Sequence, residues 1–130
     1  MRQKSIDIPS LPQYAPIPGA CRVGPFLATS AVWGSNASGQ LPPDGEAQVQ
    51  NAFHNLKLLL EAAGMDLGDV VKVTVLVSAD VRESVNKWWD HHYPDTTRRP
   101  ARTHVPTQLP SGRLVQLEAL AVAKDGAGAS

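Results

Sequence analysis

The chain has 130 residues, and its 12 Lys and Arg residues balance 12 Asp and Glu residues, so the formal net charge is zero. This length suits one domain, 1–130, and the balanced charge without a polybasic run argues against a nucleic-acid-binding surface. A single cysteine, Cys21, excludes an intramolecular disulfide framework and fits the cytoplasm, where we expect the protein to lie. No apolar run approaches 20 residues and no apolar core follows the N-terminus, so we expect neither a membrane span nor a secretory signal.

The two ends of the chain lack the patterns of regular structure. Residues 1–19 contain four prolines, which favour an extended and irregular backbone laid over a surface. We therefore expect an N-terminal arm over 1–15. The small residues of 124–130 predict a flexible tail.

A hairpin is predicted after the arm. Residues 20–23 form the first strand candidate, Gly24-Pro25 is a two-residue turn signal, and 26–32 is the return strand. A long loop, 34–45, follows because Gly, Ser, Asn, Pro and Asp dominate it.

The clearest helix is predicted over 46–63, where apolar residues recur at helical spacing. Asp44 or Gly45 is suited to cap its start, and Gly64 suits the position just after its end. The apolar stripe consists of Val49, Ala52, Phe53, Leu56, Leu59, Leu60 and Ala63.

The second half of the chain alternates strands with one helix. Residues 70–78 are rich in β-branched residues and predict a strand, and 82–92 predicts a helix that Pro94 ends. A short strand surrounds Arg102, and 114–122 is the last strand.

This order, β-β-α-β-α-β, indicates an α+β domain with both helices on one face of a mixed sheet. Val73, Val75 and Val77 alternate with Thr74 and Leu76, so both faces of that strand are fairly apolar. Two helices cannot cover both faces of the sheet. We expect the open face to pack on copies of itself in a closed homo-oligomer.

Arg102 and Glu118 are the charged pair set in the two C-terminal apolar strands. If these strands are neighbours, the Arg102 guanidinium is suited to bind a carboxylate through two hydrogen bonds, with Glu118 nearby as an acid/base group. Glu118 shares its strand face with Leu120 and Val122, so we expect it to be partly desolvated. Glu118 is equally suited to a structural role, in which it binds the backbone or a neighbouring arginine, and to a role in catalysis or in positioning water. For Arg102, residue physics alone favours a surface or inter-subunit salt bridge.

Other clusters indicate no separate chemistry. His91 and His92 are adjacent in a predicted helix, so they point about 100° apart and are poorly placed to chelate one metal ion. We therefore expect no metal site. Trp88 and Trp89 fit a core or interface position, and Cys21 fits a small buried apolar residue.

Seven sequence blocks stand out by their order and spacing: Asn55–Lys57, Leu60–Gly64, Asp69–Val75, Val85–Asn86, Pro100–Thr103, Leu109–Pro110 and Val115–Val122. Together they resemble the RidA/YjgF family of reactive-intermediate imine/enamine deaminases, which is also labelled endoribonuclease L-PSP. The resemblance covers about residues 16–123.

The resemblance implies a chorismate-mutase-like α+β fold and a homotrimer whose sheets form a central barrel. It also implies ligand clefts between subunits and hydrolysis of 2-aminoacrylate and related imino acids to 2-keto acids and ammonia, without metal or cofactor. Arg102 falls on the arginine that holds the substrate carboxylate, Glu118 on the glutamate associated with the hydrolytic water, and Asn86 on a cleft position.

The sequence departs from the family pattern at three places in the implied pocket. Ile17 follows Pro16 where a tyrosine is usual, and His104 stands where a cysteine is usual. Ser30-Ala31-Val32 replaces Ser-Gly-Gln, although Ser30 keeps the hydroxyl. We expect Ile17, Ser30 and His104 to line the substrate pocket with Arg102 and Asn86.

Three hypotheses follow. The first is a deaminase of small 2-imino acids. The second is a trimer of the same family that binds a small molecule or regulates, without efficient turnover. The third is an endoribonuclease, against which the zero net charge and the lack of a basic stripe argue.

Overall fold

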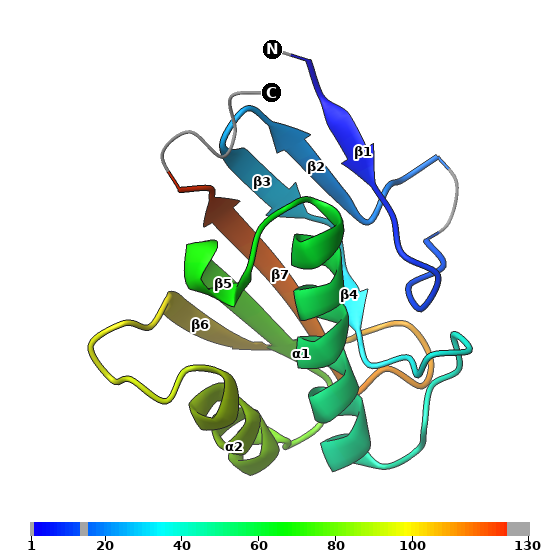
Figure 1. Ribbon diagram of the computed structural model, residues 1–130. Helices are drawn as coiled ribbons and strands as arrows, with labels where there is room; N and C mark the ends of the chain where they lie inside the picture. Colours follow the sequence, from blue (N-terminus) through cyan, green and yellow to red (C-terminus); the bar gives the residue numbers. More distant parts are fainter. Residues whose placement is uncertain (1, 14–15, 125–130) are drawn as a thin grey trace.

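The computed structural model describes residues 2–13 and 16–124, so parts of the predicted arm and tail lie outside it. Helices α1 and α2 pack on the same face of a mixed β-sheet (Figure 1). The elements are β1 (Lys4–Ile6), β2 (Ala20–Val23), β3 (Phe26–Thr29), β4 (Val32–Trp33), α1 (Gly45–Ala62), the 3-10 helix η1 (Leu67–Asp69), β5 (Val70–Val77), α2 (Arg82–His92), β6 (Ala101–Pro106) and β7 (Val115–Val122).

The strand order is β1-β2-β3-β7-β5-β6, and β4 also pairs with β7. Only β5 and β6 run parallel to each other, and α2 makes the crossover between them. The predicted α+β class and the main elements are confirmed. The predicted turn is confirmed as well, because Val23 pairs with Phe26 and Gly24 has a φ of 57°.

Two strand predictions were wrong in detail. The arm contains β1, a strand of three residues whose only buried side chain is Ile6, so it is too short for its alternation to be recognised. The return strand 26–32 splits into β3 and β4. The split occurs because the Ser30 N–H donates to Gly19 O at 2.8 Å, and the Ala119 N–H donates to Thr29 Oγ1 at 3.0 Å.

Helix α1 forms the centre of the core. Asp44 caps it by accepting the Ala47 N–H at 3.1 Å, and Gly64 follows it with a φ of 76°, as predicted. Burial of each large apolar side chain of the stripe stabilises the folded state by roughly 1.5–3 kcal/mol relative to leaving that side chain exposed. The fully buried residues of the stripe are Val49, Ala52, Phe53, Leu56, Leu59 and Leu60.

A buried polar network fastens the N-terminal arm to α1. Asn55 accepts the Ser10 hydroxyl at 2.8 Å and donates to the carbonyl oxygens of Trp33 and Ser35, each at 2.9 Å. The Ser35 hydroxyl donates to Ser10 O. One side chain thus satisfies polar groups of the arm and of the end of β4 and the loop that follows it.

The face of the sheet opposite the helices is open, as the sequence predicted. Phe26, Leu120 and Val122 expose 61%, 51% and 38% of their surface there. The register places on this face Cys21, Phe26, Ala28, Thr74, Leu76, Glu118, Leu120 and Val122. Apolar groups in such a row indicate an interaction surface.

An aromatic cluster joins the two helices. Phe53 of α1 stacks on His92 at 5.6 Å between ring centroids and meets the edge of Trp89 at 6.4 Å. Burial lowers the pKa of His92 to about 4, and the neighbouring charges of His91 and Lys57 act in the same direction. The imidazole is therefore neutral at pH 7 and packs as an apolar ring.

Asn55→Leu should destabilise the fold by about 3 kcal/mol, because it leaves buried groups of Ser10, Trp33 and Ser35 without partners. Urea denaturation measures the loss. Asn51→Leu is the control, since Asn51 is only half-buried and donates one bond, to Gly34 O at 3.2 Å. Equal losses in the two variants would contradict the role of the network.

His92→Gln should reduce the sensitivity of the fold to acid. The unfolded chain binds a proton at His92 near pH 6.5 and the folded chain only near pH 4, so the folded state loses stability as the pH falls between these values. Because the ring is half exposed, the loss is about 1 kcal/mol. Denaturation midpoints of wild type and variant should diverge from pH 7 to pH 4. A His92→Gln curve parallel to wild type would refute this origin.

Candidate functional site

Strand β6 and helix α2 bring together Asn86, Arg102 and His104, which we call the arginine group. Arg102 pairs with Val73 and His104 with Val75, so both point to the helix side of the sheet, and their predicted alternation is confirmed. The Arg102 Nη2 donates to Asn86 Oδ1 at 2.7 Å. Its guanidinium carbon lies 4.9 Å from the centroid of the Trp89 ring. The aromatic face and the amide fix the plane of the guanidinium.

Arg102 and His104 each have one side-chain nitrogen that makes no hydrogen bond among the described residues. Arg102 Nη1 and His104 Nδ1 are shielded from solvent, yet neither finds a hydrogen-bond partner among the described residues. Such orphaned groups are costly in a folded protein unless a ligand satisfies them. A guanidinium with a free donor edge is suited to bind a carboxylate.

The electrostatic surroundings of this group are positive. Burial lowers the pKa of Arg102, and the charge of Arg82 lowers it further, but the guanidinium stays charged at pH 7. Burial, and then the charges of Arg82 and Arg102, also lowers the pKa of His104, so its imidazole is neutral at that pH. One charged donor and one neutral ring therefore lie on the same face of β6.

Glu118 does not join this group. β6 and β7 are not neighbours, since β5 lies between them, so the condition under which Arg102 and Glu118 would lie side by side in one chain is not met. Glu118 pairs with Thr74 and points to the open face, whereas Arg102 points to the helix face. Glu118 is exposed in the single chain, which contradicts its expected desolvation there. Neither residue forms an ion pair with any residue in 2–13 or 16–124.

Ser30 lies beside β7, the strand of Glu118, rather than beside Arg102, and Ile17 precedes Gly19, the hydrogen-bond partner of Ser30. The chain leaves β7 after Ala28, opposite Leu120, and rejoins it at Val32, opposite Leu117, so Ser30 passes beside this stretch of β7. We call Ile17, Ser30 and Glu118 the glutamate group. Ile17 is 53% exposed and comes two residues before Gly19, whose carbonyl binds the Ser30 N–H.

The two groups therefore occupy different parts of one chain. The arginine group belongs to β6 and α2, and the glutamate group lies across β5 from it, beside β3 and β7 (Figure 1). The structure brings Asn86, Arg102 and His104 together as expected and separates them from the other three residues. A single site containing all six is not present within one copy of the chain.

Sequence reasoning missed two residues around the arginine group, Trp89 and Arg82. Arg82 lines a cavity of about 330 Å³ beside His104, and Trp89 lies against Arg102. Arg82, Asn86 and Trp89 are spaced i, i+4 and i+7, which places them on one side of α2. That spacing was a usable signal once Asn86 had been assigned to the site.

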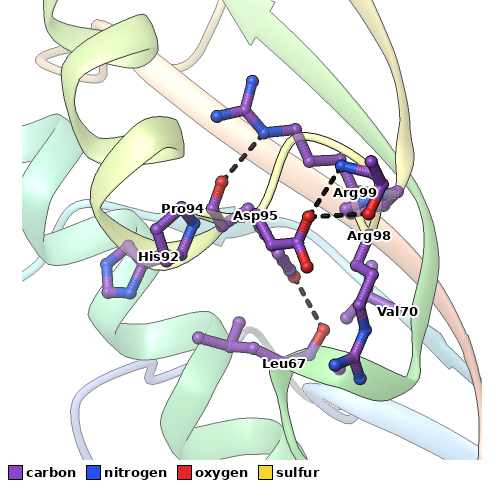
Figure 2. Close-up of a pocket in the computed structure, with 11 residues that line it drawn as sticks. Leu67, Val70, His92, Pro94, Asp95, Arg98 and Arg99 are labelled. Carbon is purple, nitrogen blue, oxygen red and sulfur yellow. Dashed lines mark hydrogen bonds between the residues drawn. The ribbon is translucent and has the colours of Figure 1, made fainter.

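A second cavity, of about 350 Å³, lies between η1 and the segment that follows α2 (Figure 2). Several of its polar groups are paired with one another: the Tyr93 hydroxyl donates to Leu67 O at 2.9 Å, and Arg99 Nε donates to Tyr93 O at 2.8 Å. The Asp95 carboxylate accepts the N–H and hydroxyl of Thr97, as Figure 2 shows. None of the expected site residues lines this cavity, so the arginine group remains the candidate site.

The described residues offer no grouping of three His, Cys, Asp or Glu side chains able to hold a metal ion. Neither helix in the described part has the length and apolar character needed to cross a membrane. The candidate site thus consists of an arginine, an amide, an imidazole and an indole.

Comparison with known proteins places this geometry in a family. The endoribonuclease L-PSP family model matches residues 8–123. The chain is 35% identical to the 2-iminobutanoate/2-iminopropanoate deaminase of Escherichia coli K12 over 89 residues, 65% of this chain and 69% of that protein.

Two crystal structures from Escherichia coli show the same fold. The YjgF gene product gives a TM-score of 0.83 at 30% identity, covering 93% of this chain and 99% of the other. TdcF with bound serine also gives 0.83, at 25% identity and the same coverage. The α+β fold with two helices on a mixed sheet is therefore that of the YjgF structures, and the chain belongs to the RidA/YjgF, or endoribonuclease L-PSP, family.

Proposed function

We propose that the protein hydrolyses reactive 2-imino and enamine acids, such as 2-aminoacrylate, to 2-keto acids and ammonia, with Arg102 binding the substrate carboxylate. The observation that carries the proposal is the unpartnered Nη1 of Arg102, held beside Asn86 and Trp89. The similarity to a 2-iminobutanoate/2-iminopropanoate deaminase supports the substrate class.

Arg102 is prepared for this role by its neighbours. Asn86 uses one amino group of the guanidinium, and the Trp89 ring covers one of its faces, so the plane is set before the substrate arrives. The remaining donors satisfy a carboxylate through charge-assisted hydrogen bonds. Fixing the carboxylate also fixes the position of the adjacent C=N carbon, which lowers the entropic cost of attack by water.

The reaction needs only water and a proton relay. The water oxygen bonds to the C=N carbon, while the imine nitrogen gains a proton, and a tetrahedral aminol forms. The C–N bond then breaks with its electron pair, ammonia leaves with the proton lost by the hydroxyl group, and the ketone carbonyl forms. Glu118 accepts the proton from water and returns it to nitrogen. No cofactor is required for this sequence.

Arg102 and Glu118 point to opposite faces of the sheet within one chain. The mechanism therefore requires that the Glu118 in each site comes from a second copy of the chain. A homotrimer with its open sheet faces turned inward supplies that arrangement. It also covers the exposed Phe26 and Leu120. Ile17 and Ser30 of the same neighbouring copy then line the pocket with His104 at the subunit interface. We place this trimer in the cytoplasm, without nucleic-acid or membrane partners.

A second candidate function is a trimer that binds a small 2-imino or 2-keto acid without efficient turnover. One observation favours it: TdcF, a family relative, was crystallised with serine bound. Binding of this kind needs Arg102 but not Glu118. An endoribonuclease is the least favoured function, because the balanced charge provides no basic surface for a polyanion.

Arg102→Ala should abolish deaminase activity without dissociating the oligomer. An amino acid oxidase acting on alanine supplies 2-iminopropanoate in situ, and the loss of imine is followed with and without the protein. Loss of the carboxylate clamp should lower kcat/KM by about two to three orders of magnitude. Native mass measurement checks the oligomer.

Arg98→Ala is the matched control, because Arg98 is an exposed arginine outside the arginine group. It should retain wild-type activity. The deaminase proposal fails if wild type does not accelerate imine loss across several 2-imino acids. It also fails if Arg102→Ala is as active as Arg98→Ala.

A further inference from the structure

A second arginine stands beside the proposed carboxylate clamp. Arg82 is the first residue of α2, one helical turn before Asn86, and lines the 330 Å³ cavity that His104 also lines. This volume is at the small end of the range for ligand pockets. The charge of Arg82 also lowers the pKa of both Arg102 and His104.

The guanidinium groups at and near this cavity are not paired with acids in residues 2–13 and 16–124, although one carboxylate lines the cavity. The Arg82 side chain makes no hydrogen bond or ion pair within the described part of the chain, and Arg102 makes no ion pair there. The carboxylate lining the cavity is that of Asp80, and it accepts the Arg82 backbone N–H at 3.4 Å rather than the guanidinium. His104 adds a shielded Nδ1 without a partner.

Arg82 and His104, with its orphaned imidazole nitrogen, line this cavity, and Arg102 lies two residues from His104 on the same face of β6. Two guanidinium groups so placed favour a ligand with two negative charges. Like charges held close together are destabilising, and an anion between them removes the repulsion. A substrate with one carboxylate satisfies Arg102 alone and leaves the Arg82 side of the cavity unmatched. The other walls, which include Val77 and Pro106, suit a short carbon chain.

We infer that Arg82 and His104 form a second anion subsite, which makes 2-imino dicarboxylates the preferred substrate class. The inference rests on the proposed function. Arg102 holds the carboxylate next to the imine, Arg82 binds the carboxylate at the end of the substrate side chain, and His104 donates a ring N–H to the same carboxylate. The keto products are then 2-oxo dicarboxylates.

Stable keto acids test the subsite without requiring turnover. Calorimetric titration should show that oxaloacetate and 2-oxoglutarate bind the wild-type oligomer about tenfold more tightly than 2-oxobutanoate. In Arg82→Gln, dicarboxylate affinity should fall about tenfold more than 2-oxobutanoate affinity. Measuring at 0.15 M salt suppresses long-range steering of anions. Arg98→Gln, which removes an exposed arginine elsewhere, should keep the wild-type ratio.

The inference is overturned if wild type binds the two ligand classes equally, or if Arg82→Gln weakens both classes by the same factor. Arg102→Ala separates this failure from failure of the proposed function. If Arg102→Ala abolishes binding of every keto acid while Arg82→Gln leaves the ratio unchanged, only the second subsite is wrong. If Arg102→Ala binds all of them as wild type does, the carboxylate clamp itself is wrong.

Discussion

Packing of α1 and α2 against one side of the sheet determines how the rest of the protein is arranged. The α1 stripe around Phe53 and Leu56 is completely buried on that side, so the helices leave nothing to cover the other. Phe26, Leu120 and Val122 remain exposed on the uncovered face. The same division gives each functional strand two unlike environments, a helix-facing one for Arg102 and an open one for Glu118.

This division gives an arginine on an edge strand the surroundings that suit the proposed binding role. On the helix side, α2 supplies Asn86 and Trp89, which hold the guanidinium and leave one of its nitrogens without a partner. On the open side, Glu118 meets no cation in the described chain. In the proposed mechanism each group is half of the reactive site, and we expect the apolar surface beside Glu118 to pack against a second copy.

Local patterns in the sequence predicted the elements but not their long-range order. The apolar stripe predicted α1, β-branched residues predicted β5, and alternation placed Arg102 and His104 on one face. The position of β5 between β6 and β7 was not predictable, because strand pairing depends on contacts between distant segments. Arg82 was overlooked for a different reason: a solvent-exposed arginine at a helix start carries no signal until the cavity beside it is seen.

The central claim is that one reactive site takes Arg102 from one copy and Glu118 from another, and mixed oligomers test it directly. Chains carrying Arg102→Ala and chains carrying Glu118→Gln, each inactive alone, are co-expressed and assayed for loss of 2-iminopropanoate. Random mixing gives about a quarter of the interfaces an intact residue of each kind, so about a quarter of wild-type activity should return. Mixed oligomers that stay as inactive as either parent would contradict the claim.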